Sequence, residues 1–189
     1  MKILKYLLYV IIVLALIFFG KGLLAPAAEY ECEVVVNKPV EEAWAILSDE
    51  SRITEWLKSI KKIELQSGTT NTVGAVSKIY AEENGQEMVM EETITAIIPN
   101  EHIAMTFTMD FMNMDYELYM KEMDGKTHIR TISSTLGNGI FAKSIVSFMT
   151  SAMKAQENEN LINLKTMIDN NTIDYFPETT LDSFEETRN

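Results

Sequence analysis

The side chains that most often do acid–base or metal chemistry are few in this chain, and their spacing does not suit it. The two histidines, His102 and His128, form neither an H-x-H nor an H-E-x-x-H pattern, the spacings that place two ligands on one face of an element. We interpret both as exposed turn or strand residues. Cys32 is the only cysteine, which excludes an internal disulfide and a zinc site built from several cysteines.

Motifs for nucleophilic catalysis and for nucleotide cofactors are absent from the sequence. It contains no G-x-S-x-G, no G-x-G-x-x-G and no G-x-x-x-x-G-K-[ST]. The first motif exposes a serine on a strained turn, and the other two hold phosphates in a glycine-rich loop. We therefore predict no catalytic residue, no metal and no cofactor, and we favour a protein that is not an enzyme.

Glu92 is the acidic residue with the most interesting position. Its neighbour Glu91 points to the opposite face of a strand, so the pair is no catalytic dyad. Glu92 shares its parity with Met88 and Met90, and an inward carboxyl without a partner would have a raised pKa. Lone charges are rarely buried, so an exposed Glu92 or a bulge is the simpler interpretation. Arg130 is a candidate partner, but the pattern does not fix the face that it takes.

These residues follow an apolar N-terminal segment that can be interpreted in two ways. Residues 6–19 are almost all Leu, Ile, Val, Phe and Tyr, and Lys21 interrupts the run. A signal peptide would be cleaved after 25–27, an A-P-A sequence. A membrane anchor needs about 20 apolar residues, which residues 4–24 supply if Lys21 extends its ammonium to the interface. We favour the uncleaved anchor.

The charges around the apolar segment predict its orientation. Lys2 and Lys5 precede it, and no acidic residue occurs before Glu29. By the positive-inside rule the N-terminus stays in the cytoplasm, and the domain lies outside it. The protein is then a single-pass membrane protein, or an exported one if the leader is cleaved. The chain beyond the leader has 13 basic and 28 acidic residues, which gives a net charge of −15. This charge argues against the basic surface that nucleic-acid binding needs.

Hydrophobic periodicity divides the remainder into strands, short helices and one long helix. Two short helices are expected after Pro39 and after Asp49, a helix N-cap residue. Alternation and turn residues predict seven strands, and four-three spacing predicts a long helix over 140–168. The predicted strands are 30–36, 60–65, 73–81, 86–98, 102–109, 113–122 and 126–135. We divide the chain into a membrane segment, residues 1–27, a domain, 28–170, and an acidic, poorly ordered tail, 171–189.

The order of these elements and several short motifs resemble a known superfamily. The run VVVNKPVEEAWAILSDESRITEWLKSI, with Pro39, Trp44, Asp49 and Trp56, is similar to the opening of START-like (SRPBCC) proteins. TVGAVSKIY, EETITAIIPNEHIAMTF, GKTHIRTIS and ENLINLKTMID resemble the strands and the final helix that follow in that group. The superfamily includes polyketide cyclase/dehydrase-like and lipid-transfer proteins, and the resemblance covers roughly residues 30–170.

The resemblance implies an α+β helix-grip fold. In that fold a curved antiparallel sheet wraps around a long C-terminal helix and leaves an apolar cavity between them. Strand parity, the helix stripe and the unusual number of methionines then give the candidate cavity residues. Methionine is flexible and polarizable, so it can line an adaptable surface or simply fill the core. The candidates are Trp56, Met88, Met90, Glu92, Met105, Phe107, Met109, Met114, Tyr116, Leu118, Phe141, Ile145, Phe148, Met149 and Ala152.

The function that we expect is binding rather than catalysis. A membrane-tethered domain would hold a small hydrophobic or lipid-like ligand between its sheet and its C-terminal helix. One alternative is a cyclase- or dehydratase-like enzyme that uses a polar group in the cavity. Another is a protein-interaction module, since the superfamily does not share one activity. The sequence leaves the ligand and the oligomeric state open.

Overall fold

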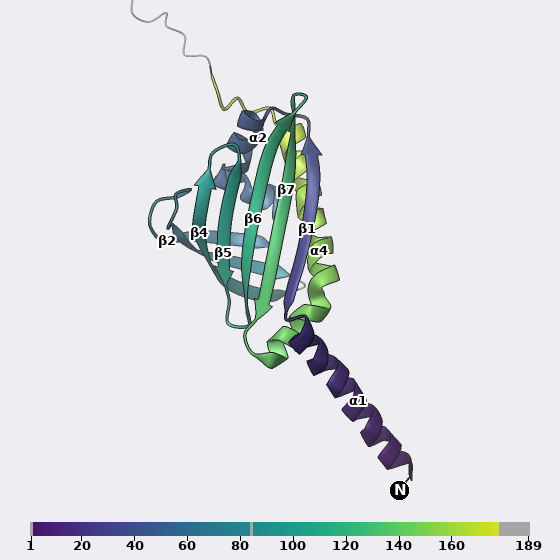
Figure 1. The fold of residues 1–189 in the computed structure, drawn as a ribbon. Coiled ribbons are helices and arrows are strands. Elements are labelled where there is room, and N and C mark those ends of the chain that lie inside the picture. The colour runs from purple at the N-terminus through teal and green to yellow at the C-terminus, as the bar shows by residue number, and fades with distance from the viewer. Residues whose placement is uncertain (1, 84, 178–189) are drawn as a thin grey trace, which may run out of the picture.

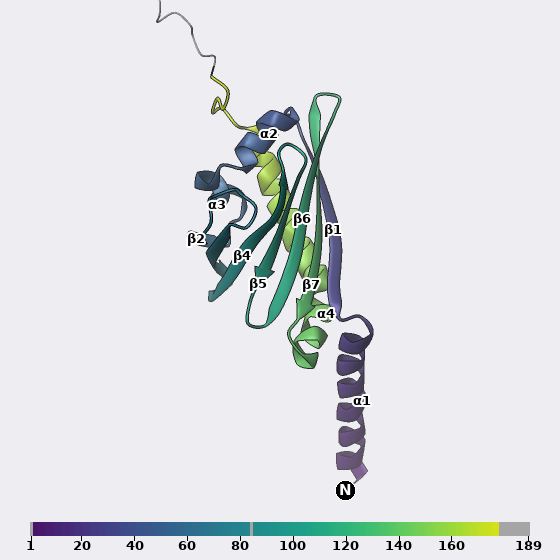
Figure 2. The same ribbon diagram turned by 60° about the vertical axis from the view of Figure 1, so that its left-hand side comes forward.

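A seven-stranded antiparallel sheet curves around one long C-terminal helix, α4, and a separate helix, α1, extends from the domain (Figures 1 and 2). The computed structural model describes residues 2–83 and 85–177. Asn84, in a predicted turn, and residues 178–189 of the predicted tail lie outside the described residues. In chain order the elements are α1 (Lys2–Leu24), β1 (Ala27–Val36), α2 (Val40–Leu47), η1 (Glu50–Arg52), α3 (Ile53–Trp56), β2 (Ile60–Ser67), β3 (Val76–Glu83), β4 (Gln86–Ile98), β5 (His102–Thr108), β6 (Met112–Met123), β7 (Lys126–Gly137) and α4 (Ile140–Asp169).

The strand order is β1-β7-β6-β5-β4-β3-β2, and every neighbouring pair is antiparallel. Strands β2 to β7 follow one another through the sheet, as hairpins joined by short turns do. The first strand, β1, lies at one edge of the sheet and pairs with the last strand, β7. This pairing runs from Ala27 opposite Leu136 to Val36 opposite Thr127. The helix-grip α+β fold expected from the sequence is confirmed.

The two short helices lie where local sequence signals place them. Helix α2 begins directly after Pro39, and its first turn carries Glu41 and Glu42, which suit the positive end of the helix dipole. Asp49 caps η1, because its carboxylate accepts a hydrogen bond from the backbone N–H of Ser51 at 3.1 Å. The predicted cap is therefore present, and it turns the chain toward β2.

The core lies between the concave face of the sheet and the second half of α4. Side chains from β1, β6, β7, α2 and α4 meet there and are almost fully buried: Val36, Ile46, Leu118, Ile129, Leu161, Leu164 and Ile168. Each such aliphatic side chain contributes about 1.5–3 kcal/mol when fully buried. The sheet and the C-terminal part of α4 are therefore held as one unit.

Among the described residues, the contacts of helix α1 with the domain lie near its own C-terminal end. The ring of Phe18 lies against the rings of Phe141 and Phe148 of α4. A side chain at Gly22 would collide with the backbone of Ser144, 2.6 Å from its nitrogen. By length and mean hydropathy, 2.6 over its most apolar window, α1 could cross a membrane, and a signal sequence would meet the same test.

The chain after α4 returns to the two short helices. The Tyr175 hydroxyl donates a hydrogen bond to Asp49 at 2.8 Å, and Arg52 donates one to the side-chain oxygen of Asn171 at 2.7 Å. The first residues of the expected tail, up to position 177, thus contact the domain.

Candidate functional site

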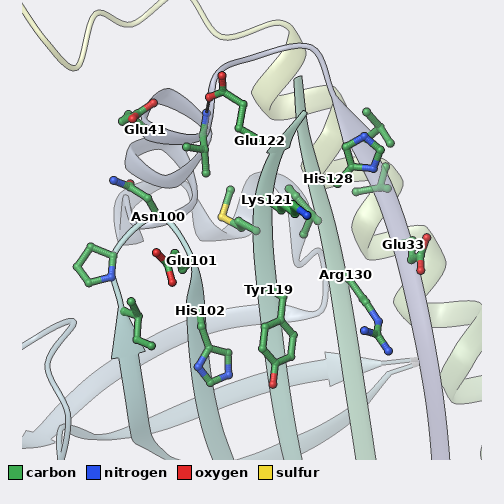
Figure 3. A pocket seen from close by; sticks show the side chains of 17 residues that line it. Glu33, Glu41, Asn100, Glu101, His102, Tyr119, Lys121, Glu122, His128 and Arg130 are labelled. Carbon is green, nitrogen blue, oxygen red and sulfur yellow. Dashed lines mark hydrogen bonds between the residues drawn. The ribbon is translucent and has the colours of Figure 1, made fainter. Parts of the chain in front are cut away.

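Two hollows lie on opposite faces of the sheet, and the larger one is polar. It has a volume of about 1000 Å³ and lies on the face turned away from α4, between β1, β6, β7 and the β4–β5 turn (Figure 3). The His102 ring stacks on Tyr119 at 4.4 Å between centroids, and its Nε2 lies 3.3 Å from Glu117 without hydrogen-bond geometry. Arg130 donates to Glu31 at 2.6 Å. Charges in this outer hollow therefore interact with one another and with solvent.

The inner cavity lies between the concave face of the sheet and the helices. Its volume is about 270 Å³, just below the usual range for small-molecule sites. Its wall is mostly apolar. The lining side chains are Trp44, Leu47, Ser48, Glu50, Ile53, Trp56, Leu57, Ser59, Ile60, Ile63, Asn71, Ile79, Ala81, Met88, Met90, Glu92, Ile94, Ile103, Met105, Phe107, Met114, Tyr116, Leu118, Glu157 and Asn160.

Glu92 and Glu50 place two carboxyl groups in this apolar wall. Glu92 projects from β4, and Glu50 comes from η1 on the opposite side. Burial, with a smaller contribution from the negative charge of Glu50, raises the pKa of Glu92 to about 7. Burial likewise raises the pKa of Glu50. Within the described residues no protein donor forms a hydrogen bond to Glu92, so its carboxyl is free to meet a ligand or water.

A third carboxyl group, Glu157 of α4, is held by a tyrosine. The Tyr116 hydroxyl of β6 donates a hydrogen bond to Glu157 at 2.9 Å, and both residues are buried. Burial raises the pKa of Glu157, and burial followed by the charge of Glu157 raises the pKa of Tyr116. This pair joins the helix to the sheet at the cavity wall.

The charge composition of the cavity wall is one-sided. Three carboxyl groups line it, and no Lys, Arg or His does so among the described residues. A buried carboxylate without a cation nearby is costly, and burial raises the pKa of each of the three groups. No cluster of three or more His, Cys, Asp or Glu able to hold a metal ion occurs in the described part of the chain. The wall can donate or accept protons and hydrogen bonds, and it can attract a cation.

Nine of the candidate cavity residues are brought together at this wall. They come from α3 and from the concave faces of β4, β5 and β6: Trp56, Met88, Met90, Glu92, Met105, Phe107, Met114, Tyr116 and Leu118. Glu92 faces inward, whereas Arg130 lies on the outer face and pairs with Glu31. Arg130 is therefore not the partner of Glu92.

Six other candidates lie away from the cavity: Met109, Phe141, Ile145, Phe148, Met149 and Ala152. Met109 is in the β5–β6 turn, and the other five are in the first half of α4. We expected Phe148 and Ala152 to face the sheet, but both are exposed, and Phe148 contacts α1. In this first half of α4 the buried side chains are small, among them Ala142 and Val146, which allows the helix to approach the sheet closely.

Sequence reasoning missed several lining residues, Glu50 of η1 and Ile79 of β3 among them. Apolar residues of α2, α3 and β2 line the cavity, among them Trp44 and Ile63, and their helical or alternating spacing was a usable signal. Glu157 and Asn160 line it from α4. They stand in the run QENEN, which resembles a solvated helix face, so no local pattern marked them.

A curved sheet that grips a helix over an internal cavity defines this protein as a helix-grip protein. The chain belongs to the polyketide cyclase / dehydrase and lipid transport family, whose profile matches residues 27–168. The expected relation to START-like (SRPBCC) proteins is thereby confirmed. The comparison with curated proteins gives no match.

Solved structures with the same fold share little sequence with this chain. TTHA0849 from Thermus thermophilus has a TM-score of 0.60 at 16% identity, covering 74% of this chain and 96% of its own. The ZhuI aromatase/cyclase from a Streptomyces species has a TM-score of 0.59 at 15% identity, covering 75% of this chain and 91% of its own. The di-domain aromatase/cyclase StfQ of the steffimycin biosynthetic pathway has a TM-score of 0.63 at 10% identity. Here 76% of this chain matches 51% of StfQ.

Proposed function

We propose that α1 is a retained membrane anchor that holds the domain outside the cytoplasm. Its 23 residues extend about 34 Å at 1.5 Å per residue, enough for a hydrocarbon core of about 30 Å. Its contact with α4 also supports retention, because cleavage after Ala27 would remove Phe18 and Gly22 from their partners.

Membrane extraction and a reporter fusion test the anchor and its orientation. Full-length protein should stay with membranes after an alkaline wash, because apolar insertion does not depend on charge. A reporter that is active only in the cytoplasm, fused after Asn189, should be silent. A soluble mature form that begins near Ala28 would contradict retention, and a strong reporter signal would contradict the orientation.

We further propose that the domain binds a small apolar molecule in the inner cavity. The observation that carries this proposal is the 270 Å³ cavity with an apolar wall between the sheet and α4. Burial of apolar ligand surface would drive binding by about 25 cal/mol per Å², before the cost of ordering the ligand. The methionines of β4, β5 and β6 can adapt to ligands of different shape.

The three carboxyl groups of the wall restrict the polar end of this ligand. A carboxylate ligand would bring a negative charge beside Glu50, Glu92 and Glu157 with no basic side chain among the described residues of the wall to offset it. A hydroxyl can donate a hydrogen bond to a carboxyl oxygen, and an ammonium group can pair with an ionised carboxylate. The ligand is thus an apolar molecule whose polar end is neutral or basic.

Three probes with the same carbon chain test this preference. Purified protein is titrated with dodecylamine, dodecanol and dodecanoate below their micelle concentrations, and we expect dodecanoate to bind most weakly. Glu92→Gln should reduce the difference between amine and acid, while Glu87→Gln, at an exposed position of the same strand, should preserve it. Equal or tighter binding of dodecanoate would contradict the proposed ligand class. Mass spectrometry of co-purifying small molecules would identify the natural ligand.

One observation favours a second candidate function, a cyclase- or dehydratase-like enzyme. A carboxyl group with a pKa of about 7 inside an apolar cavity is suited to general acid–base catalysis near neutral pH. Two proteins with the same fold, ZhuI and StfQ, are named as aromatase/cyclases. Product analysis after incubation with the co-purified ligand distinguishes the two functions. Turnover that disappears in Glu92→Gln would favour the enzyme over the binding protein.

A further inference from the structure

Large apolar side chains gather at the end of the domain that meets α1. They occupy the first turns of α4 and the neighbouring β5–β6 turn: Ile140, Phe141, Phe148, Met149 and Phe111, which we call the α4 base. All five are exposed, and Phe141 and Phe148 keep 58% and 50% of their surface open even beside α1. The two segments are linked, because the Asn138 N–H donates to the Phe111 carbonyl at 2.8 Å. Water is a poor environment for such a cluster.

Direct contacts fix the position of the α4 base along α1. The Phe18 ring stacks on Phe148 with 5.9 Å between centroids and lies 5.8 Å from Phe141. Lys21 places its Nζ 4.0 Å from the centroid of the Phe148 ring. The absence of a side chain at Gly22 allows close approach of Ser144. The two helices therefore lie side by side over the last turns of α1, as the ribbon also shows (Figures 1 and 2).

The contacts with α1 determine how deep in the membrane the α4 base lies. Phe18 precedes the end of α1 at Leu24 by six residues, or about 9 Å along the axis. If Leu24 marks the outer boundary of the hydrocarbon, Phe18 lies below that boundary. Phe141 and Phe148, which touch Phe18, must lie at nearly the same depth. Lys21 can reach the headgroups by extending along Phe148.

We propose that the α4 base is immersed in the outer interface of the membrane that α1 spans. This inference rests on the proposed anchoring and adds a second contact between protein and lipid. Aromatic side chains are favoured at that depth, and burial of their apolar surface among the acyl chains stabilises the contact between the α4 base and the membrane. The domain is then held in one orientation, with α4 rising from the bilayer and the β6–β7 hairpin at the far end (Figure 2).

Site-directed fluorescence in lipid vesicles tests the proposal. Full-length protein carrying Cys32→Ala is given one cysteine at a time, Phe141→Cys, Ile140→Cys or Val10→Cys, and is labelled with an environment-sensitive dye. Met123→Cys, at the β6–β7 hairpin, is the matched control because Met123 is 47% exposed. The vesicles are phosphatidylcholine with a fraction of lipid that carries a nitroxide quencher near the top of its acyl chains. Aqueous iodide is used as the second quencher.

We expect the nitroxide lipid to remove most fluorescence from labels at 140 and 141 and little from the label at 123, with iodide giving the reverse order. A label at 141 that iodide quenches as well as the one at 123, while the label at 10 is quenched by lipid, would overturn the immersed base and leave the anchor intact. Protection of 141 from both quenchers would assign the surface to a second protein copy and also overturn the proposal. A label at 10 that escapes lipid quenching would overturn the anchor itself.

Discussion

The two halves of α4 have different neighbours and different chemistry. The second half buries Leu161, Leu164 and Ile168 against the sheet and contributes Glu157 to the cavity wall. The first half buries only small side chains, among them Ala142 and Val146, and its Phe141 and Phe148 lie beside α1 and remain exposed. One continuous helix thus connects the proposed ligand site with the α4 base, the proposed membrane contact.

This difference teaches that an apolar helix residue does not by itself indicate the protein core. Phe148 has the larger side chain, yet it is half exposed, whereas Leu164 is fully buried. In the second half Leu161, Leu164 and Ile168 pack within the domain, and in the first half the large apolar side chains remain open to its surroundings. Substitutions in the two halves should therefore change different measured properties.

The largest effect is expected in the second half. Leu164→Ala should lower the free energy of unfolding by about 2–5 kcal/mol, because it leaves a cavity in the packed core. The matched control is Ile162→Ala, since Ile162 is 60% exposed on the same half, and it should change stability by less than about 0.5 kcal/mol. Denaturant unfolding in detergent measures both. Similar losses in the two variants would show that the helix face is misassigned.

A pH-dependent contribution to stability is expected from the cavity side. The pKa of Glu92 rises from 4.5 to about 7 on folding, so the folded state holds more protons than the unfolded state between these values. Unfolding free energy should therefore fall as pH rises through this window, by about 3 kcal/mol at most from this group. Glu92→Gln should flatten the decline, although Glu50 and Glu157, whose pKa values are also raised, retain part of it. An unchanged slope in Glu92→Gln would contradict a buried, protonated Glu92.

A smaller effect is expected from Phe148→Ala in the first half. A fully packed phenylalanine would cost about 3–5 kcal/mol on truncation, but Phe148 contacts α1 and is half exposed. We expect a loss of about 1 kcal/mol or less in detergent and no change in ligand affinity. Calorimetric binding and denaturant unfolding test this. A large loss of stability would show that Phe148 packs in the core, and a change in ligand affinity would show that it lines the cavity.

The smallest effect on domain stability is expected where the two helices cross. Gly22→Val should separate α1 from α4 because the new side chain collides with Ser144, whereas Gly20→Val should be neutral because a Cβ there meets nothing within 4 Å. In a Cys32→Ala background, a disulfide between cysteines at 18 and 148 reports the contact. Its yield should fall in Gly22→Val only, with unfolding of the domain unchanged. Equal yields in both variants would contradict the crossing.

The sequence predicted the strands and helices well because their signals are local. Alternation, turn residues and the Asp49 cap depend on neighbours in the chain, and the inward parity of Met88, Met90 and Met105 follows from them. The orientation of α4 could not be predicted in the same way. Both Phe141 and Val146 fit an apolar helical stripe, but long-range packing leaves Val146 buried and Phe141 beside Phe18 of α1.

The position of Glu157 was beyond local reasoning for a related cause. It stands among polar residues on a helix and becomes buried because Tyr116 of a distant strand lies opposite it. For Glu92 and Arg130, the alternation along each strand showed only which neighbours in the same strand share their face of the sheet. The sheet register then placed them on opposite sides, with Arg130 beside Glu31. Long-range pairing therefore determines which charges the cavity contains.

The pairing of the first strand with the last has a consequence for the order of folding. Glu31 and Arg130, which meet across β1 and β7, are separated by 99 residues. Closing so long a loop is slow, so β1 remains an unpaired edge while the rest of the chain emerges. Because β1 is the first strand in the chain, it is synthesised first and finds its partner last. Assembly of the sheet should therefore finish with the pairing of β1 and β7, and a chain stopped before β7 would leave this edge open to aggregation.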